Sequence, residues 1–166
     1  RPVWNATPLD LQRNPDTTIQ WQPLYFRHFL ASEPVRPGCV VFGPYISLAP
    51  GDYRCQYEIV LCGVPADESP IVILDVFHAG MGGVLAERSL VKSHFKQGSG
   101  GVFDLFFHVP PGVPPGFEFR VHSCGIAGFY VGNIAVYSFR PAIAYHHSHG
   151  VTDHAINLPF APATTP

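Results

Sequence analysis

Six polar and aromatic residues in two neighbouring segments have the chemistry needed to bind a sugar. The segments 102–109 (VFDLFFHV) and 117–122 (FEFRVH) alternate apolar and polar residues and flank the sequence PPGVPPG, which predicts a β-hairpin. A turn centred on Val113 would place three pairs on one face: His108 with Glu118, Phe106 with Arg120, and Asp104 with His122. Planar polar groups beside an aromatic ring suit the hydroxyl groups and CH faces of a sugar. The alternative is an ordinary solvated sheet face with cross-strand charge pairs, because a shift of one residue would break the pattern.

Other aromatic residues are candidate sugar platforms. Each of them could equally belong to the core, because aromatic side chains dominate cores as readily as binding sites. Trp4 is expected to pack into a groove of its own domain or of a neighbour. The remaining candidates for ligand binding are Trp21, Tyr25, Tyr45 and Tyr130.

Histidines gather near the carboxyl end of the sequence. Imidazole is a common ligand of transition metals, so this cluster is a candidate metal site. The spacing matches no known metal motif, and a polar, solvated segment is the competing interpretation. The candidate ligands are His146, His147, His149 and His154.

The sequence carries no recognised catalytic motif. It contains no G-x-S-x-G elbow, phosphate-binding glycine loop or zincin helix. Glycoside hydrolysis needs two carboxylates at a defined separation, which a sequence does not reveal. The carboxylates available for it are Glu58, Asp75, Asp104 and Glu118. We therefore predict a noncatalytic protein and keep a glycoside hydrolase as the weaker alternative.

The elements that must position these residues are strands. The stretch from Cys39 to Cys62 reads as a strand, a kink at Gly43-Pro44, a second strand, a turn at Pro50-Gly51 and a long alternating strand, a pattern that predicts a hairpin. Further strands are expected at 17–29, as two pieces split by Pro23, and at 71–78, 84–90, 102–109, 117–122 and 126–139.

Composition supports the same architecture. Eighteen prolines and sixteen glycines separate short apolar runs, which favours turns between strands over helices. We predict an all-β fold, an antiparallel β-sandwich or jelly roll of about eight or nine strands with no substantial helix. We expect an extended amino-terminal arm at 1–16, the sandwich at 17–140, and a histidine-rich tail or linker at 141–166.

Charge and cysteine content narrow the possible partners. The formal net charge of −2 gives no electrostatic case for nucleic acid, and no apolar run is long enough for membrane insertion by a helix. The four cysteines match no metal-ligand spacing. Cys55 falls on the apolar parity of its strand, and we expect inert core thiols rather than a required disulfide framework.

Six segments together resemble the galactose-binding-like β-sandwich of carbohydrate-binding modules. They are FGPYISLAPGDYRCQYEIVL and the later segments IVILDVF, VLAERSL, FDLFFHV, FEFRVHSCG and GFYVGNIAVYSF. The similarity covers about Tyr25 to Phe139, and its best-matched elements are Gly43-Pro44-Tyr45 and Gly51-x-Tyr53. The resemblance implies a binding role, often with a structural calcium ion, and does not fix the ligand. The long arm and the histidine-rich tail depart from the family pattern.

We therefore predict a noncatalytic carbohydrate-binding module that recognises a glycan or polysaccharide by stacking and hydrogen bonds. The alternative is a structural or adhesive subunit, such as a spike, capsid or surface-layer component, that assembles through its arm and tail. The expected partners are a glycan, a homo-oligomer or a larger parent protein, and the expected location is extracellular or surface-associated, with a cytoplasmic one as the alternative.

Overall fold

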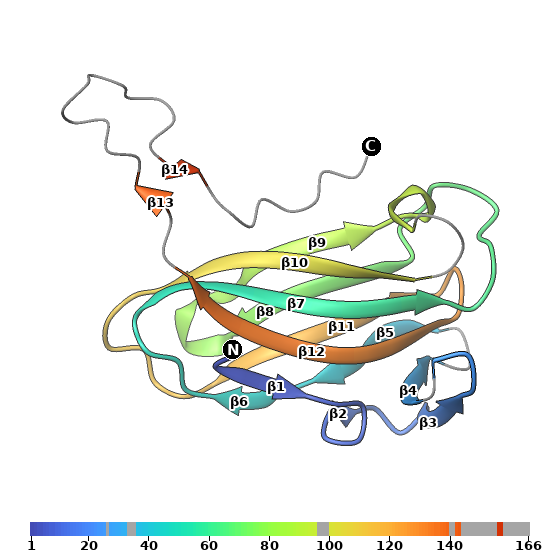
Figure 1. Cartoon of the computed structure of the whole chain (residues 1–166), viewed down its shortest axis with the longest axis horizontal. Coiled ribbons are helices and arrows are strands. Elements are labelled where there is room, and N and C mark those ends of the chain that lie inside the picture. Colours follow the sequence, from blue (N-terminus) through green and yellow to red (C-terminus); the bar gives the residue numbers. More distant parts are fainter. Residues whose placement is uncertain (26, 33–35, 96–99, 140–141, 144–155, 158–166) are drawn as a thin grey trace.

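The computed structural model describes residues 1–25, 27–32, 36–95, 100–139, 142–143 and 156–157, and these residues form a β-sandwich (Figure 1). The strands are β1 (Trp4–Ala6), β2 (Gln12–Arg13), β3 (Thr17–Gln22), β4 (Arg27–Ser32), β5 (Pro37–Phe42), β6 (Pro44–Ile46), β7 (Gly51–Leu61), β8 (Val72–His78), β9 (Gly83–Leu90), β10 (Gly100–Val109), β11 (Phe117–Cys124), β12 (Phe129–Phe139), β13 (Ala142–Ile143) and β14 (Ile156–Asn157). Two three-residue 3-10 helices, η1 (Ala79–Met81) and η2 (Lys92–His94), complete the described elements.

Two six-stranded antiparallel sheets make up the sandwich, which confirms the predicted fold class. Sheet A has the order β10-β7-β12-β4-β3, with β1 also paired to β12. Sheet B has the order β2-β5-β11-β8-β9, with β6 also paired to β11. The count exceeds the eight or nine strands expected from the sequence because several strands are only two or three residues long. A separate pair, β13 and β14, follows the sandwich.

The core lies between the two sheets. Along most of β7, β10 and β11 buried residues alternate with more exposed ones, as the alternation of side chains in a strand requires. Aromatic side chains fill much of the interior: Tyr57, Phe117, Phe119 and Phe129 are fully buried. The Tyr57 hydroxyl donates a hydrogen bond of 2.6 Å to the main-chain oxygen of Asp75 and so joins sheet A to sheet B.

Both hairpins predicted from the sequence are wrong in their pairing. The turn at Pro50-Gly51 leads from β6 in sheet B to β7 in sheet A, and the segment 110–116 leads from β10 in sheet A to β11 in sheet B. Residues rich in proline and glycine reverse the chain in both cases, but the reversal crosses between the layers. The two crossings meet at the same end of the sandwich, where the Gly116 amide donates to the Ile46 carbonyl at 3.0 Å.

The first sixteen residues take part in both sheets. β1 pairs with β12 in sheet A, and β2 pairs with β5 in sheet B. Trp4 stacks on Phe119 with ring centroids 5.2 Å apart, so its side chain packs within its own domain, as one of the two expectations had it. The segment expected to be an arm thus closes the edge of the core.

Candidate functional site

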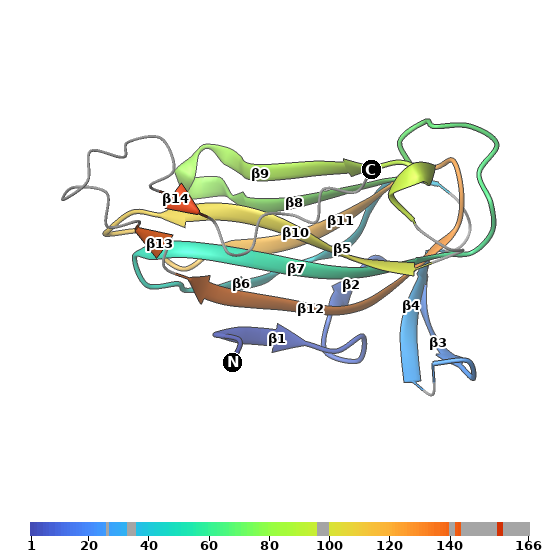
Figure 2. The ribbon, with the colours of Figure 1, turned by 45° about the horizontal axis from the view of Figure 1, so that its top comes forward.

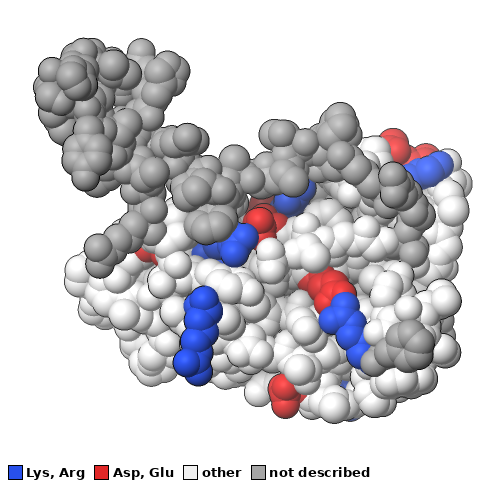
Figure 3. Space-filling view, in the orientation of Figure 1, with Lys and Arg blue, Asp and Glu red and all other residues white. Residues whose placement is uncertain are grey.

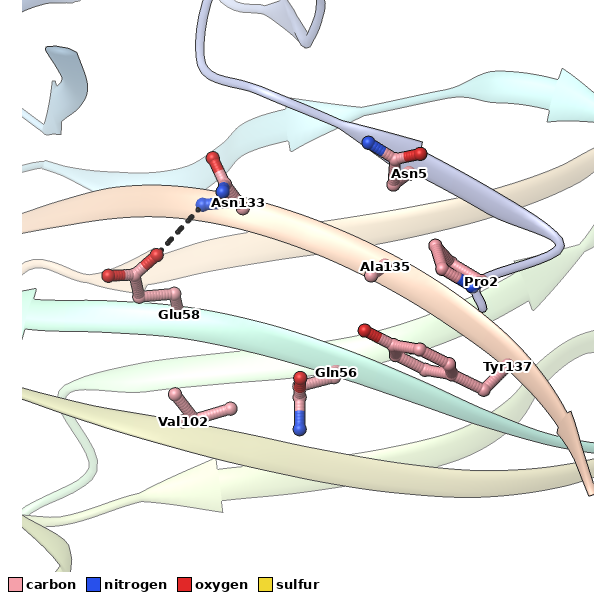
Figure 4. A pocket seen from close by; sticks show the side chains of 8 residues that line it. All are labelled: Pro2, Asn5, Gln56, Glu58, Val102, Asn133, Ala135 and Tyr137. Atoms are coloured by element: carbon pink, nitrogen blue, oxygen red, sulfur yellow. Dashed lines mark hydrogen bonds between the residues drawn. The ribbon is translucent and has the colours of Figure 1, made fainter. Parts of the chain in front are cut away.

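An open groove of about 290 Å³ lies on the outer face of sheet A. Its lining side chains project from β7, β10, β12 and the segment around β1, all on the side of the sheet that faces away from the core (Figure 4). The volume is close to the lower limit of ordinary ligand pockets, which is roughly 300 Å³. The lining residues are Pro2, Asn5, Gln56, Glu58, Val102, Asn133, Ala135 and Tyr137.

The strand register arranges most of these side chains, together with the neighbouring Phe106, Arg54 and Asp104, in three rows across the sheet. Residues paired directly opposite one another place their side chains on the same face. The rows are Phe106, Arg54 and Tyr137; then Asp104, Gln56, Ala135 and Asn5; then Val102 and Glu58, beside Asn133. From Arg54 to Glu58 the rows span roughly 13 Å at about 3.3 Å per residue.

Small and large side chains shape the groove. Ala135 occupies the middle row between the bulkier Tyr137 and Asn133, so the surface is low at its centre. The guanidinium carbon of Arg54 lies 4.6 Å from the centroid of the Tyr137 ring and supports that ring. Figure 4 shows the Tyr137 hydroxyl directed along the groove toward the space between Gln56 and Ala135.

A β-bulge in β12 forms the far wall of the groove. The pairing of β12 with β7 shifts register between Val131 and Ile134, which leaves Gly132 and Asn133 outside the ladder. The main-chain amide of Asn133 in this bulge donates a hydrogen bond of 3.2 Å to the Glu58 carboxylate. A Cβ atom on Gly132 would collide with that carboxylate, so the close approach of Glu58 requires glycine at this position.

The charged groups around the groove are paired. Glu58 forms an ion pair with Arg27, and Asp104 lies 3.8 Å from Arg54 while it accepts a hydrogen bond from Gln56 at 3.3 Å. Figure 3 shows basic and acidic side chains next to each other in several places on the described part of this face, together with one basic and one acidic side chain that stand apart. Burial raises the pKa of Asp104 above its ordinary value, although Arg54 and Gln56 act in the opposite direction. The groove therefore offers hydrogen-bonding groups with little net charge.

The six residues of the predicted binding face lie on two opposite faces of the molecule. Phe106, Asp104 and His108 are on the outer face of sheet A, because β10 pairs with β7 and not with β11. Phe106 packs edge-on against Phe139 with centroids 5.5 Å apart, and His108 Nδ1 lies 2.8 Å from Asp52 Oδ1. Only Asp104 of these three adjoins the groove, through Gln56 and Arg54.

Glu118, Arg120 and His122 belong to the outer face of sheet B. Arg120 donates two hydrogen bonds to Asp75, of 2.8 and 2.7 Å, and its guanidinium lies 3.9 Å from the Phe77 ring centroid. His122 Nε2 lies 3.0 Å from the same carboxylate. Burial alone would raise the pKa of Asp75, but the hydrogen bonds and charges of His122 and Arg120 outweigh it and hold that pKa below its ordinary value.

The other predicted aromatic platforms are dispersed. Tyr45 is half exposed on the sheet B side with φ of 69°, and burial together with the neighbouring Glu118 carboxylate raises its pKa. Trp21 and Tyr25 lie on β3 and in the turn that follows it, where Trp21 contacts His28 edge-on. Tyr130 packs beside Phe29, with ring centroids 6.1 Å apart. None of these side chains lines the groove.

Sequence reasoning did not single out four of the polar groove residues, Asn5, Gln56, Asn133 and Tyr137. Gln56 alternates with the buried residues of β7, but its neighbours on β1 and β12 are far away in the sequence. The dipeptide Gly132-Asn133 inside an apolar strand was the available signal, because a glycine there often marks a bulge.

The carboxylates considered for hydrolysis are also divided between the faces. Glu58 and Asp104 flank the groove, each in an ion pair, and Asp75 and Glu118 lie on the outer face of sheet B. Within the described ranges, no three His, Cys, Asp or Glu side chains are grouped so as to hold a metal ion. The histidines at 146, 147, 149 and 154 lie outside the described residues.

Cys39, Cys55 and Cys124 are free thiols. Cys55 is fully buried, and burial raises its pKa, which agrees with an inert core thiol. In the part of the chain that the structure describes, no helix has the length and apolar character needed to cross a membrane.

Solved structures of carbohydrate-binding modules share this fold. The chain aligns with a family 6 carbohydrate-binding module of Cellvibrio mixtus lichenase 5A in complex with cellotriose, with a TM-score of 0.54, 10% identity, and coverage of 84% of this chain and 100% of that one. The carboxyl-terminal family 6 module of a laminarinase from Zobellia galactanivorans gives a TM-score of 0.54, 15% identity, and coverage of 81% and 98%. A family 16 carbohydrate-binding module gives 0.54, 13% identity, and coverage of 74% and 86%.

No protein-family model and no curated protein sequence matches the chain. The structural matches confirm the predicted resemblance in fold, a β-sandwich like that of the carbohydrate-binding modules.

Proposed function

We propose that this chain is a noncatalytic carbohydrate-binding module that binds an uncharged segment of a glycan in the sheet A groove. The observation that carries the proposal is the grouping of one supported tyrosine ring with three amide side chains in a single open groove. The Tyr137 ring would contact the CH face of a sugar, and Asn5, Gln56 and Asn133 would exchange hydrogen bonds with its hydroxyl groups.

Charge pairing supports an uncharged ligand. Arg27 and Arg54 are already matched by Glu58 and Asp104, so neither cation is free to select an anionic sugar. The fold shared with modules that bind oligosaccharides agrees with this assignment.

The two acidic groups beside the groove do not suit catalysis. Glu58 is held by Arg27 and by the Asn133 amide, and Asp104 by Arg54 and Gln56. A general acid or base must be available to exchange protons with the substrate. We therefore infer a binding role without hydrolysis.

The test is a glycan array followed by calorimetric titration of the best ligand with the wild type, Tyr137→Ala and Tyr45→Ala. These variants remove the same side chain from opposite faces of the sandwich. We expect saturable binding that Tyr137→Ala weakens about five- to thirtyfold, corresponding to about 1–2 kcal/mol, while Tyr45→Ala leaves it unchanged. Loss of binding in Tyr45→Ala alone would move the site to sheet B, and no binding to any glycan would reject the proposal.

The same assay addresses the remaining expectations. Repeating the titration with calcium and with a chelator tests the calcium prediction. Incubating the ligand with the protein and looking for new reducing ends tests for hydrolysis. An extracellular or surface location and a larger parent protein fit a glycan-binding module, and both stay part of the proposal.

A further inference from the structure

The β3–β4 hairpin ends sheet A in an unprotected edge. Figure 2 shows the two strands extending beyond the rest of the sandwich. β3 pairs with β4 from Thr17–Ser32 to Gln22–Arg27, and among the described residues β4 is its sole strand partner. The Thr17 amide donates to the Asn14 carbonyl at 3.1 Å, so the outer backbone groups that another strand could use are those of the residues after Thr17.

The other edges of the two sheets are protected. Edge strands usually avoid unwanted pairing by being short or by carrying charged residues and bulges. β1, β2 and β6 have only two or three residues. β9 carries Glu87 and Arg88 and pairs through a bulge, and β10 carries Asp104.

β3 has none of these protections. Its sequence, TTIQWQ, is six residues long and contains no charged residue and no proline. Two of its large apolar side chains are in solvent, Trp21 at 52% and Ile19 at 36% relative exposure. Both lie on the same face of the strand, two residues apart, and the glutamines alternate with them.

The sequence of β3 is also complementary to itself. In an antiparallel pair of two β3 strands centred on Gln20, each Ile19 lies opposite the partner's Trp21, and each Thr18 opposite the partner's Gln22. The two glutamines at position 20 face each other on the twofold axis. Pairs of β-branched and aromatic residues stabilise neighbouring strands, and no like charges are opposed. Such a contact uses the same edge in both copies and therefore closes at two.

We propose that two copies of this chain pair through β3 in this register and join their A sheets into one continuous sheet. The proposal concerns a surface separate from the groove, since no residue of β3 lines it. The occupant of the edge is a second copy because the register matches apolar with apolar and amide with amide residues.

The test uses opposite charges at the twofold axis. Sedimentation velocity on the full chain, over a wide range of concentration, should show a reversible dimer for the wild type. Gln20→Lys and Gln20→Glu should each raise the dimer dissociation constant about tenfold or more, because like charges then face each other. An equal mixture of the two variants should restore dimers, because the charges across the axis are then opposite.

Control variants keep the test decisive. Ser89→Lys adds the same charge to β9, the edge of sheet B, and should leave the dimer unchanged. If Gln20→Lys does not fold, Trp21→Lys replaces it, since that exposed side chain faces the partner's Ile19. A monomer at every concentration, dimers unaffected by both lysine variants on β3, or assemblies that continue beyond two would each overturn the proposal.

Discussion

The guanidinium carbon of Arg54 lies 4.6 Å from the centroid of the Tyr137 ring, and its Nη1 atom lies 3.8 Å from Asp104 Oδ2. One side chain thus supports the candidate platform and neutralises the acid beside it. The three residues come from β12, β7 and β10, so their arrangement depends on the pairing of these strands.

Replacing Arg54 should loosen the platform without removing it. We expect Arg54→Met to weaken glycan binding about two- to fivefold, because a cation over an aromatic ring at the surface contributes about 0.5–1 kcal/mol. Calorimetric titration measures the change. Arg88→Met is the matched control. The Arg88 guanidinium carbon lies 5.3 Å from the Phe103 ring centroid, and neither residue lines the groove. Equal losses of affinity in both variants would argue against the role of Arg54.

Gly132→Ala should disturb the far wall of the groove. The new Cβ would displace the Glu58 carboxylate from the bulge, so Asn133 would lose its acceptor and change position. We expect weaker glycan binding with a small loss of stability, about 1 kcal/mol for one hydrogen bond. Gly112→Ala is a useful comparison, because a Cβ there meets no neighbour within 4 Å, although its φ of 82° adds backbone strain. Unchanged affinity in Gly132→Ala would show that the bulge is not part of the site.

Asp75 should control the acid stability of the domain. Asp75 is 2% exposed and its carboxylate binds Arg120 and His122, so we expect Asp75→Asn to lower the free energy of unfolding at pH 7 by about 2–4 kcal/mol. The folded-state pKa lies below the ordinary value. The contribution is therefore full above the unfolded pKa of about 3.9 and decreases as the pH falls through the folded pKa.

The pKa of Asp104 is shifted in the opposite direction to that of Asp75, so the pH dependence of stability has the opposite sign. Its pKa is raised in the folded state, mainly by burial, so its ionisation as the pH rises through that pKa lowers stability. Asp104→Asn should therefore cause no loss at pH 7. Urea unfolding of both variants between pH 3 and 7 would check the pair, and a large loss in Asp104→Asn would contradict the expected sign.

The bond between the two sheets has its own test. Tyr57→Phe removes the hydroxyl that binds the Asp75 main-chain oxygen in the core and should lower the free energy of unfolding by about 1–2 kcal/mol. Tyr53→Phe removes a bond of 2.7 Å to Ala49, which stays within one connection, and should have a smaller effect. Equal losses in the free energy of unfolding would mean that the hydrogen bond between the sheets stabilises the domain no more than the one within a connection.

The strands were predictable from sequence because alternation is local. The run from Tyr53 to Leu61 shows its buried and exposed faces in its own residues, and it forms most of β7. The partners of each strand were not predictable in this way. A turn such as Pro50-Gly51 reverses the chain equally well within one sheet and between two sheets, and both predicted hairpins turned out to be crossings.

The error in pairing carried over to the site. Arg120 and Phe106 were placed together because the sequence 110–116 was read as a hairpin turn, and the structure separates them by the thickness of the sandwich. The groove instead unites Asn5, Gln56 and Asn133, which no local pattern connects. The fold class needed only composition and periodicity, whereas the groove depended on long-range register.

The alternation along β7, β10 and β12 has a practical consequence for protein engineering. Core positions such as Cys55 and Val136 alternate with groove positions such as Gln56 and Ala135. The two sets lie on the same strands, but their side chains are on opposite faces of the sheet. A combinatorial library at Gln56, Val102 and Ala135 would change the lining of the groove while the core positions keep their residues. The outer surface of sheet A can therefore be redesigned without rebuilding the core.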